Sequence, residues 1–121
     1  MERIAEGEYA VMEVLWEESP LTAAEVAERV PADRGWSLPT VKTMLSRLLA
    51  KGALAHAQDG RRYLYRPAIA REDYVAEESG RLIDRMFGGR LTPLVAQLAA
   101  RDRLSPADID EIEALLKELK S

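Results

Sequence analysis

The chain has 121 residues, with 17 Lys and Arg residues against 21 Asp and Glu residues, and a formal net charge of −4. Its 47% hydrophobic content suits a folded protein of one ordinary domain, or of one small domain with a helical appendage. No apolar run reaches about 18 residues, so we expect no membrane insertion. The absence of cysteine excludes disulfides and thiolate chemistry. No secretion signal is visible, and we expect a cytoplasmic protein.

Two helices are predicted in the first 35 residues. Residues 4–16 place their apolar side chains on one helical face, opposite acidic residues. Pro20 ends this helix. A second helix follows, because Thr22 and Glu25 have the spacing of a capping box. The sequence PADRG at 31–35 ends the second helix.

A third helix is predicted to begin at Ser37, a good N-cap residue, and to end at Gly52. At about 100° per residue, its apolar side chains form one buried stripe, and small polar side chains flanked by basic ones form the opposite face. The stripe consists of Val41, Met44, Leu45 and Leu48, and the opposite face of Pro39, Thr40, Lys42, Thr43, Ser46, Arg47 and Ala50.

A β-hairpin is predicted around the Asp-Gly pair at 59–60, because Asp-Gly is a strong signal for a two-residue turn. Such a turn places Leu54 opposite Tyr65 and His56 opposite Tyr63. These larger side chains share one face of the hairpin, which we expect to point inward. Three helices followed by a basic hairpin are typical of a winged helix.

After the hairpin the pattern is helical only. The last predicted helix starts at Ser105, and its apolar residues step by three and four, as in a coiled-coil seam. About two heptads are too few to stand alone, so we expect this seam to pack against a second copy. The predicted dimer interface comprises Val75, Leu82, Met86, Leu94, Leu98, Ile109, Ile112, Leu116 and Leu119.

The expected fold class is therefore mainly α with a small β-hairpin. We assign an N-terminal winged helix-turn-helix that binds DNA to residues 1–70 and a three-helix dimerisation region to residues 71–121.

Positive charge gathers in one window of this acidic chain. Residues 34–66 hold seven basic residues and one acidic residue, a net charge of +6, whereas residues 1–33 carry −7 and residues 67–121 carry −3. DNA-binding proteins gain affinity by neutralising phosphates with Lys and Arg. A helix with a small polar face can also enter the major groove. The predicted DNA-binding residues are Ser37, Thr40, Lys42, Thr43, Ser46, Arg47, Lys51, Arg61 and Arg62.

An alternative is a winged helix that holds a protein partner without sequence-specific DNA binding, because fold alone does not define function. An enzyme is not expected. His56 is the only histidine and the chain has no cysteine, so His56 lacks the partners that a metal-binding or catalytic role would need. No phosphate-binding glycine loop is present. We expect no cofactor and no metal.

The sequence resembles the bacterial penicillinase and methicillin-resistance repressors, a family shared with copper-transport repressors. The resemblance rests on EYAVMEVLW, LTAAEVAE, WSLPTVKTMLSRLLAKGAL, DGRRYLYRP, RMFGGRLTPLV and LSPADIDEIEALL, in the family's order. It implies a homodimer that represses transcription from a dyad-symmetric operator, with the tail helices forming the dimer. It also implies control of a β-lactamase gene or a related antibiotic-response regulon.

Two departures from the family pattern affect these expectations. The sequence Ser-Leu-Pro-Thr at 37–40 stands where many relatives read Ser-Pro-Lys-Thr, so one basic residue is missing from the DNA face. Members linked to antibiotic resistance are inactivated by cleavage of an Asn-Phe bond. Gln97 and Leu98 take that position here. The resemblance implies a regulatory cleavage region at these two residues and a protease linked to a membrane sensor as a partner. The Cys-rich motif of the copper-responsive members is absent.

Overall fold

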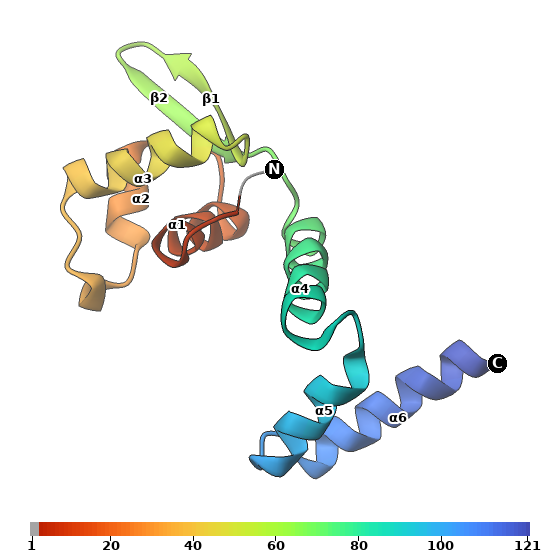
Figure 1. The fold of residues 1–121 in the computed structure, drawn as a ribbon. Helices are drawn as coiled ribbons and strands as arrows, with labels where there is room; N and C mark the ends of the chain where they lie inside the picture. The colour runs from red at the N-terminus through yellow and green to blue at the C-terminus, as the bar shows by residue number, and fades with distance from the viewer. Residues whose placement is uncertain (1–2) are drawn as a thin grey trace. The chain divides into compact units, whose positions relative to one another are not determined.

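The chain divides into two compact units, Met1–Tyr74 and Val75–Ser121 (Figure 1). The computed structural model describes residues 3–121, so Met1 and Glu2 of the predicted first domain lie outside the described residues. The division falls inside helix α4 (Arg71–Phe87), whereas the sequence prediction placed the domain boundary in front of this helix. Among the described residues, no helix combines the length and apolar character needed to cross a bilayer.

The first unit contains three α-helices followed by an antiparallel two-stranded hairpin (Figure 1). This order confirms the predicted fold class. The elements are α1 (Glu6–Glu17), α2 (Ala23–Arg29), the 3₁₀ turn η1 (Ala32–Arg34), α3 (Leu38–Ala50), β1 (Leu54–Asp59) and β2 (Arg62–Pro67).

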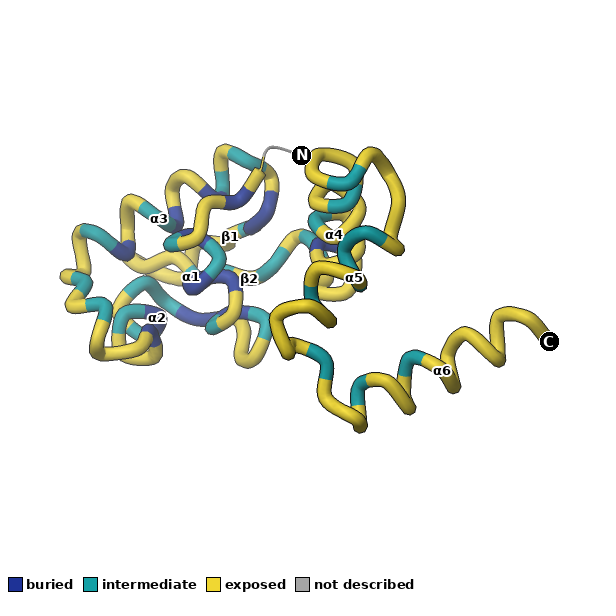
Figure 2. The backbone as a smooth tube through the Cα atoms, turned by 60° about the horizontal axis from the view of Figure 1, so that its bottom comes forward, coloured by how far each residue is buried: buried dark blue, intermediate teal, exposed yellow. Residues whose placement is uncertain are grey.

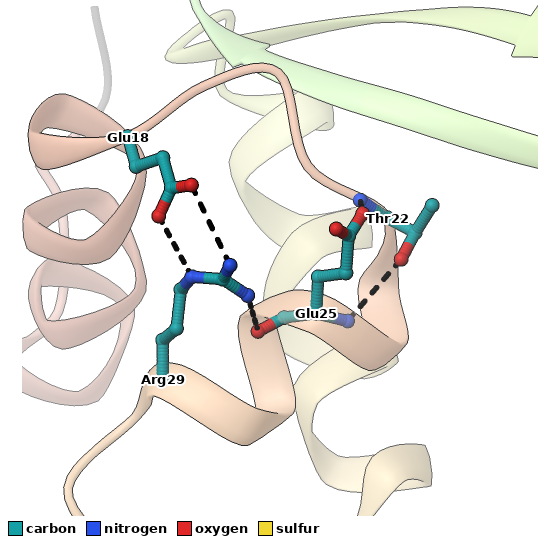
Figure 3. A network of polar contacts seen from close by, with 4 residues as sticks. All are labelled: Glu18, Thr22, Glu25 and Arg29. Atoms are coloured by element: carbon teal, nitrogen blue, oxygen red, sulfur yellow. Dashed lines mark hydrogen bonds and ion pairs between the residues drawn. The ribbon is translucent and has the colours of Figure 1, made fainter.

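Local hydrogen bonds explain where α2 begins. The Thr22 hydroxyl accepts a bond from the Glu25 backbone N–H at 3.2 Å, and the Glu25 carboxylate accepts one from the Thr22 N–H at 2.9 Å (Figure 3). This reciprocal pair is the predicted capping box. The same figure shows Arg29 donating to the Glu18 carboxylate at 2.9 Å and to the Glu25 carbonyl at 3.1 Å. The end of α1 is thereby tied to α2.

Helix α3 is capped at both ends as predicted. The Ser37 hydroxyl accepts a bond from the Thr40 N–H at 3.4 Å, although this contact is long. At the other end, Gly52 has φ +79°, a left-handed conformation that glycine adopts without steric cost.

The core of the first unit contains buried residues of α1, α2, α3 and β1 (Figure 2). Within α3, Val41, Leu45 and Leu48 have no exposed surface, and Met44 is half-buried. Full burial of such side chains contributes about 1.5–3 kcal/mol each. The buried stripe predicted for α3 is therefore present, and it fixes which face of this helix stays exposed. The largest fully buried residues are Met12, Leu15, Leu45, Leu48, Val11, Val26 and Val41.

The predicted register of the hairpin is wrong by two residues. Asp59 pairs with Arg62, so the turn residues are Gly60 and Arg61 rather than Asp59 and Gly60. Of these two turn residues only Gly60 has a positive φ, and a leading glycine is typical of one class of two-residue turn. Placing Asp59 at the end of the strand also brings its carboxylate to the guanidinium of Arg62.

A shift of two residues leaves every side chain on its predicted face. Leu54 is buried, and Tyr65 packs against the core and bonds through its backbone to Leu21. The expectation of an inward face fails farther along the hairpin, where His56 and Tyr63 are exposed. Their rings stack on each other instead, with centroids 4.6 Å apart.

The second unit contains the later part of α4, α5 (Leu91–Ala100) and α6 (Pro106–Lys120). Helix α6 begins with the predicted cap: the Ser105 hydroxyl accepts from the Asp108 N–H, and the Asp108 carboxylate accepts from the Ser105 N–H, both at 3.0 Å. No residue from Val75 to Ser121 is buried (Figure 2). This unit therefore has no hydrophobic core of its own.

Candidate nucleic-acid interface

The exposed face of α3 carries the predicted small and polar side chains. Thr43 and Ser46 are exposed, and Thr40 is partly covered. The Thr43 hydroxyl donates to the Pro39 carbonyl at 3.1 Å, which leaves its oxygen lone pairs free to accept a further bond. Ser37 and Thr40 lie close together at the start of the helix, where their hydroxyl oxygens are 3.1 Å apart. The structure therefore places four of the predicted residues along one side of α3.

Basic side chains border this face. Lys42 and Arg47 are exposed on α3, and Arg61 is exposed in the hairpin turn. Within residues 3–121, neither Lys42 nor Arg61 has a carboxylate partner. Arg62 differs, because its Nε and Nη2 donate to one oxygen of Asp59 at 3.0 and 2.9 Å. Lys42 and Arg61 thus face solvent uncompensated, whereas Arg62 is held by an acid of its own hairpin.

Lys51 does not belong to this face. Its ammonium group contacts the Glu8 carboxylate at 2.5 Å and donates to the Arg3 carbonyl at 2.8 Å. Glu8 is only 2% exposed. Burial by itself raises the pKa of Glu8, but the hydrogen bonds from Lys51 and the Ala5 N–H, with nearby positive charge, lower the pKa overall. We therefore remove Lys51 from the predicted DNA-binding residues and assign it a role in holding α1 and α3 together.

The sequence held a signal that Glu8 has a buried partner, although not that the partner is Lys51. Glu8 stands on the apolar face of α1, at helical spacing between Ile4, Val11 and Leu15, all of which are buried. A carboxylate in that stripe needs a buried partner.

A groove of about 410 Å³ lies between the start of α2, the start of α3 and the hairpin. Sequence reasoning missed several of its residues because they come from three separate segments. Its lining consists of Thr22, Ala23, Ala24, Leu38, Lys42, Arg61, Arg62, Tyr63 and Tyr65.

The predicted dimer-interface residues are all at least partly exposed within the chain. Leu94, Leu98 and Ile112 are half-buried, and the other six are exposed, up to 82% for Leu119. Leu115 is 61% exposed and was not among the predicted residues. The six exposed residues of the predicted dimer interface are Val75, Leu82, Met86, Ile109, Leu116 and Leu119.

The predicted cleavage residues lie inside α5 rather than in a loop. Gln97 is exposed and Leu98 is half-buried. In residues 3–121, no three His, Cys, Asp or Glu side chains come together in a way that would hold a metal ion.

Three helices, a hairpin and a basic exposed face on the third helix define a winged-helix protein. The family model described as "Penicillinase repressor" matches residues 4–118, and the chain therefore belongs to the penicillinase repressor family. This confirms the resemblance seen in the sequence. The members of this family are transcriptional repressors and not enzymes.

Individual relatives agree over nearly the whole chain. The penicillinase repressor of Bacillus licheniformis is 35% identical over 119 residues, 98% of this chain and 93% of its own length. The methicillin resistance regulatory protein MecI of Staphylococcus aureus (strain N315) is 24% identical over 115 residues, 95% of this chain and 94% of its own. Among solved structures, monomeric Bacillus licheniformis BlaI in complex with the blaP half-operator is 40% identical, with a TM-score of 0.52. That alignment covers 60% of this chain and 89% of BlaI.

Proposed function

We propose that this DNA-binding repressor places the exposed face of α3 in the major groove of an operator and binds that operator as a homodimer. The observation that carries the proposal is the two-sided character of α3. Val41, Leu45 and Leu48 are fully buried on one side, and the opposite side presents small polar groups bordered by cations. The major groove is about 12 Å wide and admits such a helix.

The residues divide into two roles. Thr43 and Ser46 lie at the centre of the exposed face, where short side chains let the helix approach base edges. Lys42 and Arg47 lie at its borders and reach phosphates or a guanine edge. Arg61 and its neighbour Arg62 contact the flanking backbone from the hairpin, and Ser37 and Thr40 add hydroxyls at the start of α3. Base contacts specify the sequence, and backbone contacts supply most of the affinity.

The second unit supports the homodimer. Its apolar side chains are exposed or half-buried, and none of them is fully buried within the chain. Isolated helices as short as the 15 residues of α6 are marginal in water, so a packing partner is needed. A second copy offers the same seam and forms a two-fold interface. Such a dimer sets two copies of α3 about 34 Å apart along DNA, or a multiple of that distance, and so requires a dyad-symmetric operator.

The functions of the relatives indicate which genes this repressor controls. Penicillinase and methicillin-resistance regulators support control of a β-lactamase gene or a related antibiotic-response regulon. Binding to bacterial DNA also supports a cytoplasmic location. For the inducing step we propose proteolysis near Gln97 and Leu98 by a protease linked to a membrane sensor, with a recognition sequence that differs from the family's Asn-Phe pair.

Selection of random duplex DNA by the full chain tests the proposed function. We expect enrichment of one inverted repeat. Failure to enrich any sequence, together with stable binding of a protein partner by the same surface of α3, would favour the alternative of a protein-interaction module.

Substitution of Thr43 by alanine is expected to change sequence preference more than overall affinity. Loss of a base-edge contact costs about 1–3 kcal/mol at the affected base pair. Repeating the selection with Thr43→Ala should relax one symmetric pair of positions in the repeat. An unchanged consensus would place Thr43 away from the bases.

Substitution of Arg61 by alanine is expected to weaken binding to all sequences alike. Loss of one phosphate contact lowers the magnitude of the slope of log affinity against log salt by roughly one unit. Titrations at several salt concentrations measure this slope. Arg103→Ala is the matched control, because Arg103 is an exposed arginine of the second unit. If both variants keep the wild-type slope, the hairpin does not contact DNA.

Cleavage within α5 is expected to release DNA. Separating most of the second unit from the winged helix removes the linkage between two half-sites, and linkage of this kind is commonly worth a factor of about 10²–10⁴. A protease site inserted after Leu98 should lower operator affinity at least tenfold when cut, measured by gel shift. The uncut insertion variant is the control. A cut protein that stays dimeric and fully bound would show that this segment is not the switch.

A further inference from the structure

The groove between α2, α3 and the hairpin combines cationic and apolar groups. Lys42 and Arg61 line it, and neither has a carboxylate partner within residues 3–121. Leu38 and Tyr63 line it as well, with 38% and 44% of their surfaces exposed. Among the described residues up to 74, no other large hydrophobic side chain is this exposed. The two exposed apolar groups of the first unit thus share one groove with two uncompensated cations.

The two apolar side chains that line the groove are held in place by neighbouring structure. The ring of Tyr63 stacks on His56, with centroids 4.6 Å apart and planes at 14°. Leu38 lies in the first turn of α3, directly after the Ser37 cap. Both side chains therefore rest on ordered backbone, and neither is needed for the buried core. Exposed apolar groups that lie together, as these two do in one groove, often mark a binding surface.

Arg62 lines the same groove with its charge already occupied. Its guanidinium donates two bonds to one oxygen of Asp59, and both side chains are more than half exposed. An exposed pair of this kind contributes little to stability. A phosphate forms charge-assisted and often bidentate bonds to a guanidinium, as a carboxylate does, so it is able to replace Asp59.

We propose that this groove seats one sugar-phosphate unit of the DNA backbone. The phosphate contacts Lys42 and Arg61, and the deoxyribose packs on Leu38 and Tyr63. In the free protein the Asp59 carboxylate occupies the guanidinium of Arg62, and a DNA phosphate replaces this carboxylate on binding. The inference rests on the proposed DNA binding and adds Leu38, Tyr63 and Asp59 to its machinery.

Continuity with α3 favours DNA as the source of this phosphate. Lys42 belongs both to the groove and to the border of the exposed face of α3. A backbone that flanks a major groove filled by α3 therefore passes this side chain. A free organic phosphate shares the same chemistry, and the experiment separates the two sources.

The test uses the duplex recovered by the selection described above, with single phosphates replaced by neutral methylphosphonates. For the wild-type chain, one position in each half-site should lower affinity about five- to tenfold. In Lys42→Met, the same replacement should cost clearly less than in the wild type, because one of the charges that contact this phosphate is already gone. Thr43→Ala is the control, and it should keep the full wild-type penalty. If the affinity losses caused by Lys42→Met and by each methylphosphonate simply add at every position, the phosphate does not contact Lys42 and the assignment is wrong.

The same duplex tests the packing of the deoxyribose on Leu38 and Tyr63, and the replacement of the Asp59 carboxylate by a phosphate. Tyr63→Ala and Leu38→Ala should each weaken binding several-fold for every sequence, with the consensus unchanged. Asp59→Asn should tighten binding several-fold at low salt, because Arg62 no longer has an internal anion. Unchanged affinity in all three variants would overturn the proposal.

These experiments distinguish a failure of the proposed DNA binding from a failure of the groove assignment alone. If the selection enriches no duplex, the proposed DNA binding itself is wrong. If DNA binds but no methylphosphonate position couples to Lys42, only the groove assignment is wrong. Saturable binding of deoxyribose 5-phosphate at micromolar concentration, together with that lack of coupling, would assign the groove to a free organic phosphate instead.

Discussion

Replacing Lys51 with alanine is expected to lower the free energy of unfolding by about 3 kcal/mol at pH 7. The reason is the buried carboxylate of Glu8, which is only 2% exposed and would lose its cationic partner. Removing one member of a buried ion pair is costly because the other charge stays desolvated. Urea unfolding of the winged-helix unit measures the change. Lys42→Ala is the matched control, since exposed, unpaired lysines contribute little to stability.

The same pair predicts a pH dependence. In the folded chain the pKa of Glu8 lies below its ordinary value of 4.5. A carboxylate with a lowered folded pKa stabilises the protein above its unfolded pKa, and this contribution is lost as pH falls through the folded pKa. The stability gap between wild type and Lys51→Ala should therefore shrink as pH falls towards and below 4.5. A gap that is constant with pH, or a loss of DNA affinity without loss of stability, would contradict the assignment.

Replacing Leu116 with aspartate is expected to separate the proposed dimer and to weaken binding to the full operator by about 10²–10⁴-fold. Leu116 lies in the α6 seam and is 49% exposed within the chain. A charge at that position would have to be buried against the second copy without a partner. Binding to a half-site should be unchanged, because the winged helix is untouched.

Sedimentation and operator titration measure these two effects together. Ala114→Asp provides the control, because Ala114 is exposed on α6 on the side opposite the seam. It introduces the same charge and should leave both dimerisation and affinity intact. A Leu116→Asp chain that remains dimeric at micromolar concentration would show that the α6 seam is not the interface.

Local features could be predicted from the sequence because a few neighbouring residues determine them. The caps at Thr22, Ser37 and Ser105 each depend on a side chain and a backbone N–H three residues away. The buried stripe of α3 follows from helical periodicity alone. The family resemblance was also visible in the sequence.

Features that depend on distant residues could not be predicted in the same way. Lys51 and Glu8 are 43 residues apart, and nothing in the basic window indicates that one of its charges is directed inward. The hairpin register was missed because an Asp-Gly pair fits two turn placements. In the observed turn placement, Asp59 pairs with Arg62 across the strands and their side chains are in contact. The groove is assembled from three segments, so its apolar residues have no common sequence signal.

Hydroxyl-radical cleavage of the selected duplex, bound to the full chain, tests the central claim most directly. A homodimer with α3 in two successive major grooves predicts protected backbone patches related by a dyad and separated by about one helical turn, or a multiple of it. A single asymmetric patch, or no protection at saturating protein, would contradict this account.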